Sequence, residues 1–407
     1  MINSETTMVS ADKILSADVI RHVYPAGAWS EVKEVWQELE QRSPYTSFFI
    51  SSIWVESWLS VFGDSLPVEL VIFRASGLPV GACVLVRRIR RHGPFRLRRV
   101  FLNTSGEDPG DSPYIEFNNV LCLAGWEQTL ARALHDLVHR QSWDEFILNG
   151  FCQGAPLQAL RQSFSRFSET KVTKANYYVD LSRIRDSQQP YLSALRAKNR
   201  TRVRRFFKDY GETTVEQART AAQAQQMLEE LAGLHQQTWS NRGQVGAFAS
   251  QRFVSFHRRL VENAFGLGAI QLVRVRAIHT VGLLYNFIYG GNVYFYQSGL
   301  DYSVCPSGKP GFVTIVSVIN HCLGNPALKT FQFMPGGGEY KEPLATGCDE
   351  QEWIVFKSKS WRNRLVWRVQ GLKNRGALLR REKVPPVAEM GQPSVPSTND
   401  RAHDSTE

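Results

Sequence analysis

Hydrophobic positions in this chain recur with two spacings, one typical of helices and one typical of strands. Helical spacing is found in residues 31–40, 51–62, 126–141, 192–210, 218–239, 251–263 and 312–323. Strand-like runs lie between them, at residues 68–73, 80–86, 99–102, 145–148, 177–181, 269–275, 281–289, 293–297, 329–333 and 352–356. This mixture predicts an α/β fold, with mixed sheets flanked by helices.

The predicted elements run helix, helix, strands, helix, strand in the first half, and the second half repeats this order loosely. The chain has 407 residues, more than a typical single domain. We therefore predict two tandem domains, at residues 18–170 and 171–356. We also expect a flexible N-terminus at residues 1–17, a basic amphipathic helix at residues 357–383 and a disordered tail at residues 384–407.

The formal net charge of +10 is concentrated in three windows. Residues 87–99, 194–208 and 357–383 hold 24 of the 48 Lys and Arg residues, and only one acidic residue. The rest of the chain is acidic, so the overall charge does not indicate general affinity for nucleic acid, and no DNA partner is expected.

The six cysteines are scattered singly, without a C-x-x-C pair or a spacing that groups them with His. We interpret them as reduced thiols of a cytoplasmic protein, and we predict no metal site. The first residues include Glu5, Asp12 and Lys13 and lack the apolar stretch of a signal peptide. The uncharged residues 277–300 contain Gly290-Gly291-Asn292, which predicts two strands joined by a tight turn.

A glycine-rich loop between a strand and a helix is the strongest candidate for binding an anion. Residues 294–296 read as strand, residues 305–311 as loop, and an apolar helix follows. Free backbone N–H groups at such a helix start stabilise phosphate. A Walker loop is excluded, because Pro310 follows Lys309 where Ser or Thr is needed, and the dinucleotide fingerprint is absent. An ordinary strand-to-helix connection would look the same, so the loop alone does not establish a site.

The segments around this loop resemble the GNAT acyltransferase superfamily, in particular its CelD-like and FemAB-like branch. The residues that carry the resemblance are Leu234-His235, Trp239, Arg242-Gly243, Phe256-His257, Tyr294-Phe295-Tyr296-Gln297-Ser298-Gly299, Pro306-Ser307-Gly308 and Glu339-Tyr340-Lys341. The sequence departs from that branch at Gln332, where Asp is frequent, and at Lys309-Pro310, which enlarges the loop.

The resemblance implies two GNAT-like halves and an acyl-CoA co-substrate, with acetyl-CoA as the expected form and no metal. Two strands would separate, the thioester arm would lie in the gap, and loop amides would hold the pyrophosphate. The implied donor-binding residues are Ser307, Gly308, Lys309, Gly311, Phe312 and Lys341. Lys341 also fits a solvated lysine at the end of a loop.

The implied chemistry is direct attack of an amine or hydroxyl on the thioester, so no nucleophilic Ser or Cys is needed. The candidate bases are His257 and Asp301, and the candidate acids are Tyr296 and Tyr340. His257 lies among apolar helix positions, so it also fits a buried helix residue, and Tyr296 also fits a core position.

The acceptor implied by the resemblance is a sugar, a lipid or a cell-envelope precursor. An alternative donor is aminoacyl-tRNA, which would contact Arg200, Arg202 and Arg204 on the basic helix. A third reading is a non-catalytic, membrane-associated assembly factor for polysaccharide export. Residues 357–383 would contact the inner face of the membrane through Trp361 and Leu365, or would pack on the second domain.

Overall fold

The computed structural model of the chain describes residues 19–92, 95–303, 305, 308–336, 338, 340–359 and 365. Its strands form a single continuous mixed sheet in the order β1-β2-β3-β4-β6-β13-β7-β12-β11-β10-β9-β8, with β5 paired to β3. The strands are β1 (Val19–Pro25), β2 (Val68–Ala75), β3 (Leu78–His92), β4 (Phe95–Leu102), β5 (Leu121–Cys122), β6 (Glu145–Cys152), β7 (Ser168–Asp180), β8 (Thr214–Gln217), β9 (Ile270–Arg276), β10 (Thr280–Tyr289), β11 (Asn292–Leu300), β12 (Thr330–Pro335) and β13 (Gly347–Lys357).

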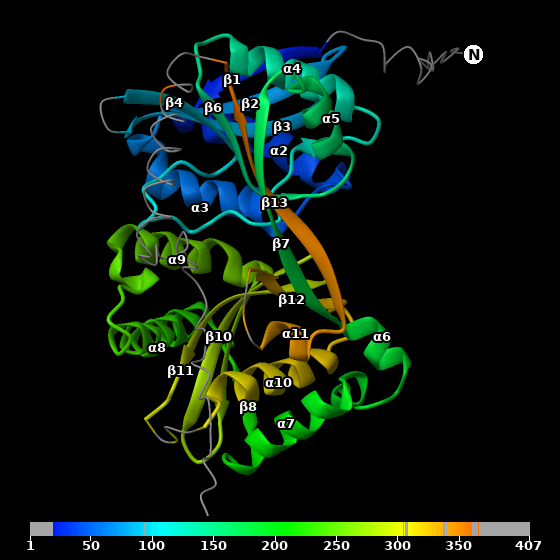
Figure 1. Cartoon of the computed structure of the whole chain (residues 1–407), viewed down its shortest axis with the longest axis vertical. Helices are drawn as coiled ribbons and strands as arrows, with labels where there is room; N and C mark the ends of the chain where they lie inside the picture. Colours follow the sequence, from blue (N-terminus) through cyan, green and yellow to red (C-terminus); the bar gives the residue numbers. More distant parts are fainter. Residues whose placement is uncertain are drawn as a thin grey trace, which may run out of the picture.

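Helices cover both faces of this sheet (Figure 1). The longer ones are α2 (Trp29–Arg42), α3 (Ser52–Phe62), α4 (Glu127–His139), α5 (Ala155–Ser163), α7 (Ala197–Lys208), α8 (Ala221–Ser240), α9 (Gln251–Ala264) and α10 (Pro310–Leu323), and the short ones α6 (Leu181–Asp186) and α11 (Lys341–Leu344). One core cluster joins α2, α3, α8 and α9 on one face, while α4 with α5 and α7 with α10 form two clusters on the other. The predicted α/β sheet flanked by helices is confirmed.

Two long strands join the N-terminal half (β1 to α5) to the C-terminal half (α6 to α11). β13, the last strand of the chain, pairs along β7 and also pairs with β6 of the N-terminal half. Figure 1 shows β7 and β13 running from one half into the other. The predicted boundary at residues 170 and 171 lies within β7, so the two halves share one sheet rather than two.

The basic window at residues 87–99 lies mostly in paired strands, although we expected a strand only from residue 99. β3 and β4 pair in antiparallel register from Leu85 opposite Leu102 to His92 opposite Phe95. Arg90, Arg91 and Arg96 are exposed on these strands, as is Ile89, whereas Leu97 is buried. The tight turn at Gly290 and Gly291 is confirmed, because both have positive φ and β10 pairs with β11 directly across it.

Several predictions cannot be checked against the structure. The predicted flexible N-terminus at residues 1–17 and the predicted disordered tail at residues 384–407 lie outside the described residues. The predicted basic helix at residues 357–383 also lies outside them, except for residues 357–359 and 365. Within the described part of the chain, no helix is both long enough and apolar enough to cross a membrane.

An aromatic cluster fills the contact between the halves. Phe48 and Trp54 of the N-terminal half meet Phe256 and Phe287 of the C-terminal half. Phe48 stacks on Phe287 with ring centroids 4.4 Å apart, and Trp54 meets Phe256 edge to face at 4.9 Å. Such contacts combine a large buried apolar area with favourable ring geometry, so the two halves stabilise each other.

Phe287→Ala is expected to lower the free energy of unfolding by about 3–5 kcal/mol, because the side chain is fully buried and its removal leaves a cavity between the halves. Urea titrations followed by tryptophan fluorescence and by far-UV circular dichroism should give coincident transitions. Leu267→Ala is the control, since Leu267 is exposed and its loss should change stability by less than about 0.5 kcal/mol. A Phe287→Ala variant as stable as the control would contradict this role.

Candidate functional site

Strands β11 and β12 separate halfway along their length. Their parallel pairing runs from Asn292 opposite Thr330 to Tyr294 opposite Gln332 and ends there. Just beyond, Tyr296 is an extra residue in β11, because consecutive residues of β10 pair with Gln297 and Phe295 of β11 and skip the residue between them. β12 also loses register against β7 here, and Met334 adopts φ +63°. Bulges bend and twist a strand, so two of them at one level open the sheet.

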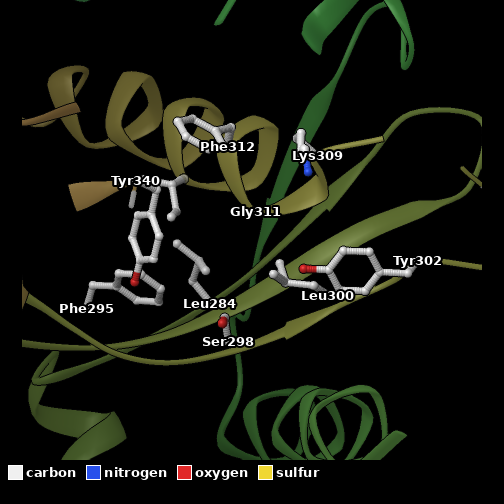
Figure 2. A pocket seen from close by; sticks show the side chains of 10 residues that line it. Leu284, Phe295, Ser298, Leu300, Tyr302, Lys309, Gly311, Phe312 and Tyr340 are labelled. Carbon is white, nitrogen blue, oxygen red and sulfur yellow. The ribbon is translucent and has the colours of Figure 1, made fainter. Parts of the chain in front are cut away.

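A narrow cavity, here called the donor slot, lies between this part of β11 and the start of α10 (Figure 2). Its volume is about 30 Å³ and its walls are mostly apolar. The slot is lined by Leu284, Phe295, Ser298, Leu300, Tyr302, Lys309, Gly311, Phe312, Ile315 and Tyr340. Pro310 occupies the first turn of α10, where its missing N–H costs nothing.

Four of the predicted residues meet in the donor slot: Lys309, Gly311, Phe312 and Tyr340. The Tyr340 ring packs between Phe312 and Phe333, and burial raises the pKa of its hydroxyl. Gly308 lies outside the lining and packs so tightly that an added Cβ would stand 2.4 Å from the Tyr210 hydroxyl. Ser307 lies outside the described residues.

A much larger cavity of about 750 Å³, here called the central cleft, lies on the other face of the sheet. Tyr296 and Met334 line it and belong to the core under α8 and α9, whereas Phe295 belongs to the core under α10. Both halves contribute walls. The charged residues in its lining are Arg88, Arg90, Arg99, Glu107, Asp108, Glu116, Lys174 and Lys341.

His257, one of the two predicted bases, is fully buried on α9, and its Nε2 lies 3.1 Å from the Tyr296 hydroxyl. That hydroxyl donates its only proton to the carbonyl of Pro113, at 2.7 Å. His257 must therefore donate its own Nε2–H to the tyrosine oxygen, and its buried Nδ1 has no hydrogen-bond partner within the described residues, as in the neutral ring. Burial lowers the pKa of His257 to about 3, in agreement. The histidine thus positions Tyr296 and has no surface towards an acceptor.

The structure places Asp301 and Lys341 in local contacts. Asp301 follows β11 and accepts hydrogen bonds from the amide and hydroxyl of Ser303, at 2.8 and 2.6 Å. It lines neither cavity. Lys341 is 1% exposed, and its ammonium donates to the carbonyls of Met334, Pro335 and Gly336 at 2.9–3.3 Å. Lys341 therefore holds the chain where β12 ends, beside the cleft.

Two acidic residues in the cleft were not singled out from the sequence, Glu107 and Glu116. Burial raises the pKa of each carboxyl to about 7. They stand on a segment, residues 103–120, that the sequence marks only as a loop rich in Gly, Asp, Ser and Pro. Such a loop has no periodic pattern, so its only signal was a group of four carboxylates, at positions 107, 108, 111 and 116, in a long connection without regular structure.

The segment at residues 103–120 is strained and held firmly. Asn103, Tyr114 and Phe117 all have φ between +48° and +63°, which is unfavourable for residues with a Cβ. Asn103 Nδ2 donates to Asn118 Oδ1 at 2.7 Å, and Asn118 donates to the carbonyls of Leu102 and Asn149. Strain that is fixed by buried hydrogen bonds is typical of functional sites.

Comparison with known proteins identifies the family of part of the chain. Residues 193–342, which include the donor slot, match the family described as acetyltransferase (GNAT) domain. These residues belong to the GNAT superfamily. The GNAT match begins before α7 and ends just after Lys341, so it also covers the point where β11 and β12 part.

Solved structures with low sequence identity are similar to this chain, and FemX shares its fold. FemX has a TM-score of 0.52 and 10% identity, with 83% of this chain and 98% of FemX covered. A conserved protein of unknown function from Bacteroides thetaiotaomicron VPI-5482 has a TM-score of 0.47 and 11% identity, covering 81% of this chain and 97% of that one. A tandem GNAT protein from the clavulanic acid biosynthesis pathway has a TM-score of 0.46 and 10% identity, covering 84% of this chain and 100% of that one. A search of curated proteins found no match.

The His257→Gln variant is expected to differ from the wild type in the pH dependence of stability. A folded-state pKa of about 3 lies below the ordinary 6.5, so the unfolded chain takes up this proton first as the pH falls. The contribution of His257 is complete above about pH 6.5 and decreases by about 1.4 kcal/mol per pH unit below it. The free-energy gap between wild type and variant should therefore narrow by that amount per unit between pH 6 and 4, in urea titrations.

Tyr296→Phe is the matched control, because it removes the hydrogen-bond partner and keeps the titrating group. Tyr296→Phe should lower the free energy of unfolding by about 1–3 kcal/mol, since a buried carbonyl and a buried N–H lose their partner. Its free energy of unfolding should also depend on pH in the same way as that of the wild type. A gap between His257→Gln and wild type that stays constant with pH would show that His257 is not buried in its neutral form.

Proposed function

We propose that the protein transfers an acyl group, with acetyl as the expected one, from acyl-CoA to an amine or hydroxyl of an acceptor bound in the central cleft. The observation that carries this is the separation of β11 and β12 between two cavities. The donor slot and the cleft adjoin the same stretch of β11 from opposite faces of the sheet. A thioester arm in the slot would present its carbonyl to a nucleophile on the other side.

The slot is narrow and mostly apolar, as the arm of acyl-CoA requires, and from about 30 Å³ it would have to widen to admit that arm. The arm would lie between Phe295 and Phe312, and the pyrophosphate would lie near Lys309 and the first turn of α10, where backbone N–H groups are unpaired by the helix itself. Among the described residues, no group of three or more His, Cys, Asp or Glu is placed to hold a metal ion.

Tyr340 would assist the departure of the thiolate. Burial raises the pKa of its hydroxyl above the ordinary value of a tyrosine, and so above that of a thiol. Full proton transfer to the thiolate is then unfavourable, whereas a hydrogen bond donated to the sulfur stabilises its negative charge. The proton that the thiol finally carries would come from the nucleophile, through the base and solvent.

The cleft suits an acceptor larger than a simple amine. Its volume of about 750 Å³ is in the range of sites for sizeable ligands. Apolar side chains, Phe101, Val172 and Trp353, share the walls with Arg90 and Lys174. A sugar, lipid or cell-envelope precursor that carries negative charge would match this combination.

A second candidate donor is aminoacyl-tRNA, and the position of α7 favours it. This basic helix packs on α10, and the guanidinium of Arg202 lies 5.0 Å from the ring of Phe312, which lines the donor slot. Arg204, Arg205 and Lys208 are exposed along the same helix. A donor with many phosphates would lie against this surface, with its acyl end in the slot.

Gly311→Val is expected to weaken acetyl-CoA binding at least about tenfold, a loss of about 1.4 kcal/mol. A Cβ at this position would already stand 3.2 Å from Leu300 Cδ1, so the larger side chain narrows the slot where the arm would pass. Isothermal titration calorimetry measures the affinity, and thermal unfolding with acetyl-CoA or adenosine measures protection.

Gly233→Val on α8 is the control for the same substitution, because an added Cβ there meets nothing within 4 Å. It should bind acetyl-CoA as the wild type does. The acyl-CoA assignment would be wrong if acetyl-CoA protected the wild type no better than adenosine. It would also be wrong if both glycine variants lost affinity equally.

Binding of bulk tRNA at increasing salt separates the two donors. With acyl-CoA as the donor, we expect no saturable tRNA binding and no displacement of acetyl-CoA by tRNA. Aminoacyl-tRNA as the donor would instead give binding that weakens steeply with salt, and replacing Arg200, Arg202 and Arg204 by Gln would flatten that dependence. Arg259→Gln on α9, an exposed arginine of another surface, is the control.

A further inference from the structure

The carboxyl of Glu116 faces the central cleft, where the charges of Lys341 and Lys174 act on it. It lines the cavity, and within the described part of the chain it makes no hydrogen bond or ion pair. Glu107, the other carboxyl with a raised pKa, is held more tightly. It is 8% exposed, and its Oε1 accepts a hydrogen bond from the Ser112 hydroxyl at 2.5 Å. Of the two, Glu116 is the carboxyl that is free to meet a ligand.

The backbone around Glu116 is fixed by strain and close packing. Tyr114 and Phe117, on either side, have φ of +49° and +48°. The amide of Phe117 donates to Gln351 Oε1 at 2.9 Å, which ties the segment to β13. On β6, a Cβ at Gly150 would stand 2.9 Å from the Cα of Glu116, so only glycine allows this approach. The structure therefore holds the backbone on either side of Glu116 in an unfavourable but well-defined conformation.

The charges around Glu116 come from several elements. Lys341 of α11 and Lys174 of β7 both favour the ionised carboxyl, while burial opposes it, and the resulting pKa is about 7. Glu116 in turn raises the pKa of Tyr296 on β11, as do Tyr114 and Glu107 of its own segment. Lys341 is anchored to the carbonyl of Met334, at the bulge of β12. Glu116 thus stands near the opening between β11 and β12.

We propose that Glu116, supplied by the N-terminal half, is the general base for acyl transfer in the GNAT half. The proposal rests on the proposed function. The lone pair of the acceptor nitrogen forms a bond to the thioester carbonyl carbon, the C–S bond breaks, and the electron pair leaves on sulfur. The proton of the nitrogen passes to the Glu116 carboxylate and is later released to solvent, which returns a proton to the thiolate.

The other groups near this opening fit the role less well. His257 has a free Nδ1, but it is fully buried and its pKa of about 3 makes it a weak base. Asp301 is bound to Ser303 and lines neither cavity. Tyr296 donates its proton to Pro113. Glu116 combines access to the cleft with a pKa close to physiological pH, which a general base needs.

The first experiment follows the carboxyl itself in the full-length protein. Infrared difference spectra of the wild type between pH 5.5 and 8.5 should show a protonated carboxyl that ionises near pH 7. In Glu116→Gln the signal of that carboxyl should be absent, and the signal of Glu107 should remain. Gln has the shape of a protonated Glu and carries no charge, so the variant should fold with a melting temperature at least as high as that of the wild type. A difference spectrum identical to the wild type would overturn the proposal.

The second experiment measures thiol release from acetyl-CoA, with ethanolamine as a surrogate acceptor, across the same pH range. The wild-type kcat should rise with pH through about 7. Glu116→Gln should lower kcat at pH 8 by about 100-fold or more and remove this rise, with unchanged affinity for acetyl-CoA. Glu229→Gln, an exposed glutamate on α8, should behave as the wild type.

The outcomes separate the base from the proposed function. If the wild type does not bind acetyl-CoA, the donor assignment fails, whatever Glu116 does. If it binds and turns over acetyl-CoA but Glu116→Gln keeps the pH rise and a similar rate, Glu116 is not the base. The rise then belongs to the acceptor amine. If ethanolamine is not acylated although acetyl-CoA binds, the infrared titration decides: ionisation of Glu116 well below pH 7 overturns the proposal.

Discussion

The arrangement of the whole site depends on the interruption of hydrogen bonding between β11 and β12. A parallel pair inside a sheet normally continues as long as both strands do, because each buried N–H and C=O needs a partner. Here one extra residue at Tyr296 and a left-handed residue at Met334 break both strands at the same level. The gap lies between a narrow apolar slot and a wide cleft that has both charged and apolar walls. Lys341 compensates part of the cost by binding three carbonyls at the end of β12.

A gap of this kind is useful only if the walls on its two sides keep their relative position. The shared strands β7 and β13 and the aromatic contacts of Phe48 and Trp54 with the C-terminal half provide that rigidity. Interiors packed in this way transmit strain and resist sliding. The segment at residues 103–120 is built on one half, and the slot on the other. The function we propose therefore requires both halves, and the contact between them is part of the site.

Much of the fold was predictable, because periodic hydrophobic patterns and turn residues report local structure directly. The hairpin of β10 and β11 followed from Gly290-Gly291, and the slot residues Lys309, Gly311, Phe312 and Tyr340 followed from the resemblance. Long-range pairing was not predictable in this way. The insertion of β13 between β6 and β7 depends on contacts some 200 residues apart, as in Gln351 opposite Cys152. The burial of His257 and the exposure of Glu116 to the cleft arise from the same packing.

The buried titratable groups act on stability in opposite directions. His235 and His257 have lowered pKa values, of about 4 and 3, so their contribution decreases as the pH falls below about 6.5. Glu107 and Glu116 have raised pKa values, so their contribution is complete below about pH 4.5 and is lost as the pH rises through 7. Near neutral pH the two histidines make their full contribution to the free energy of unfolding, whereas ionisation of the two carboxyls lowers it. A buried carboxyl with a raised pKa that lines a cleft, as Glu116 does, is a candidate for a functional role.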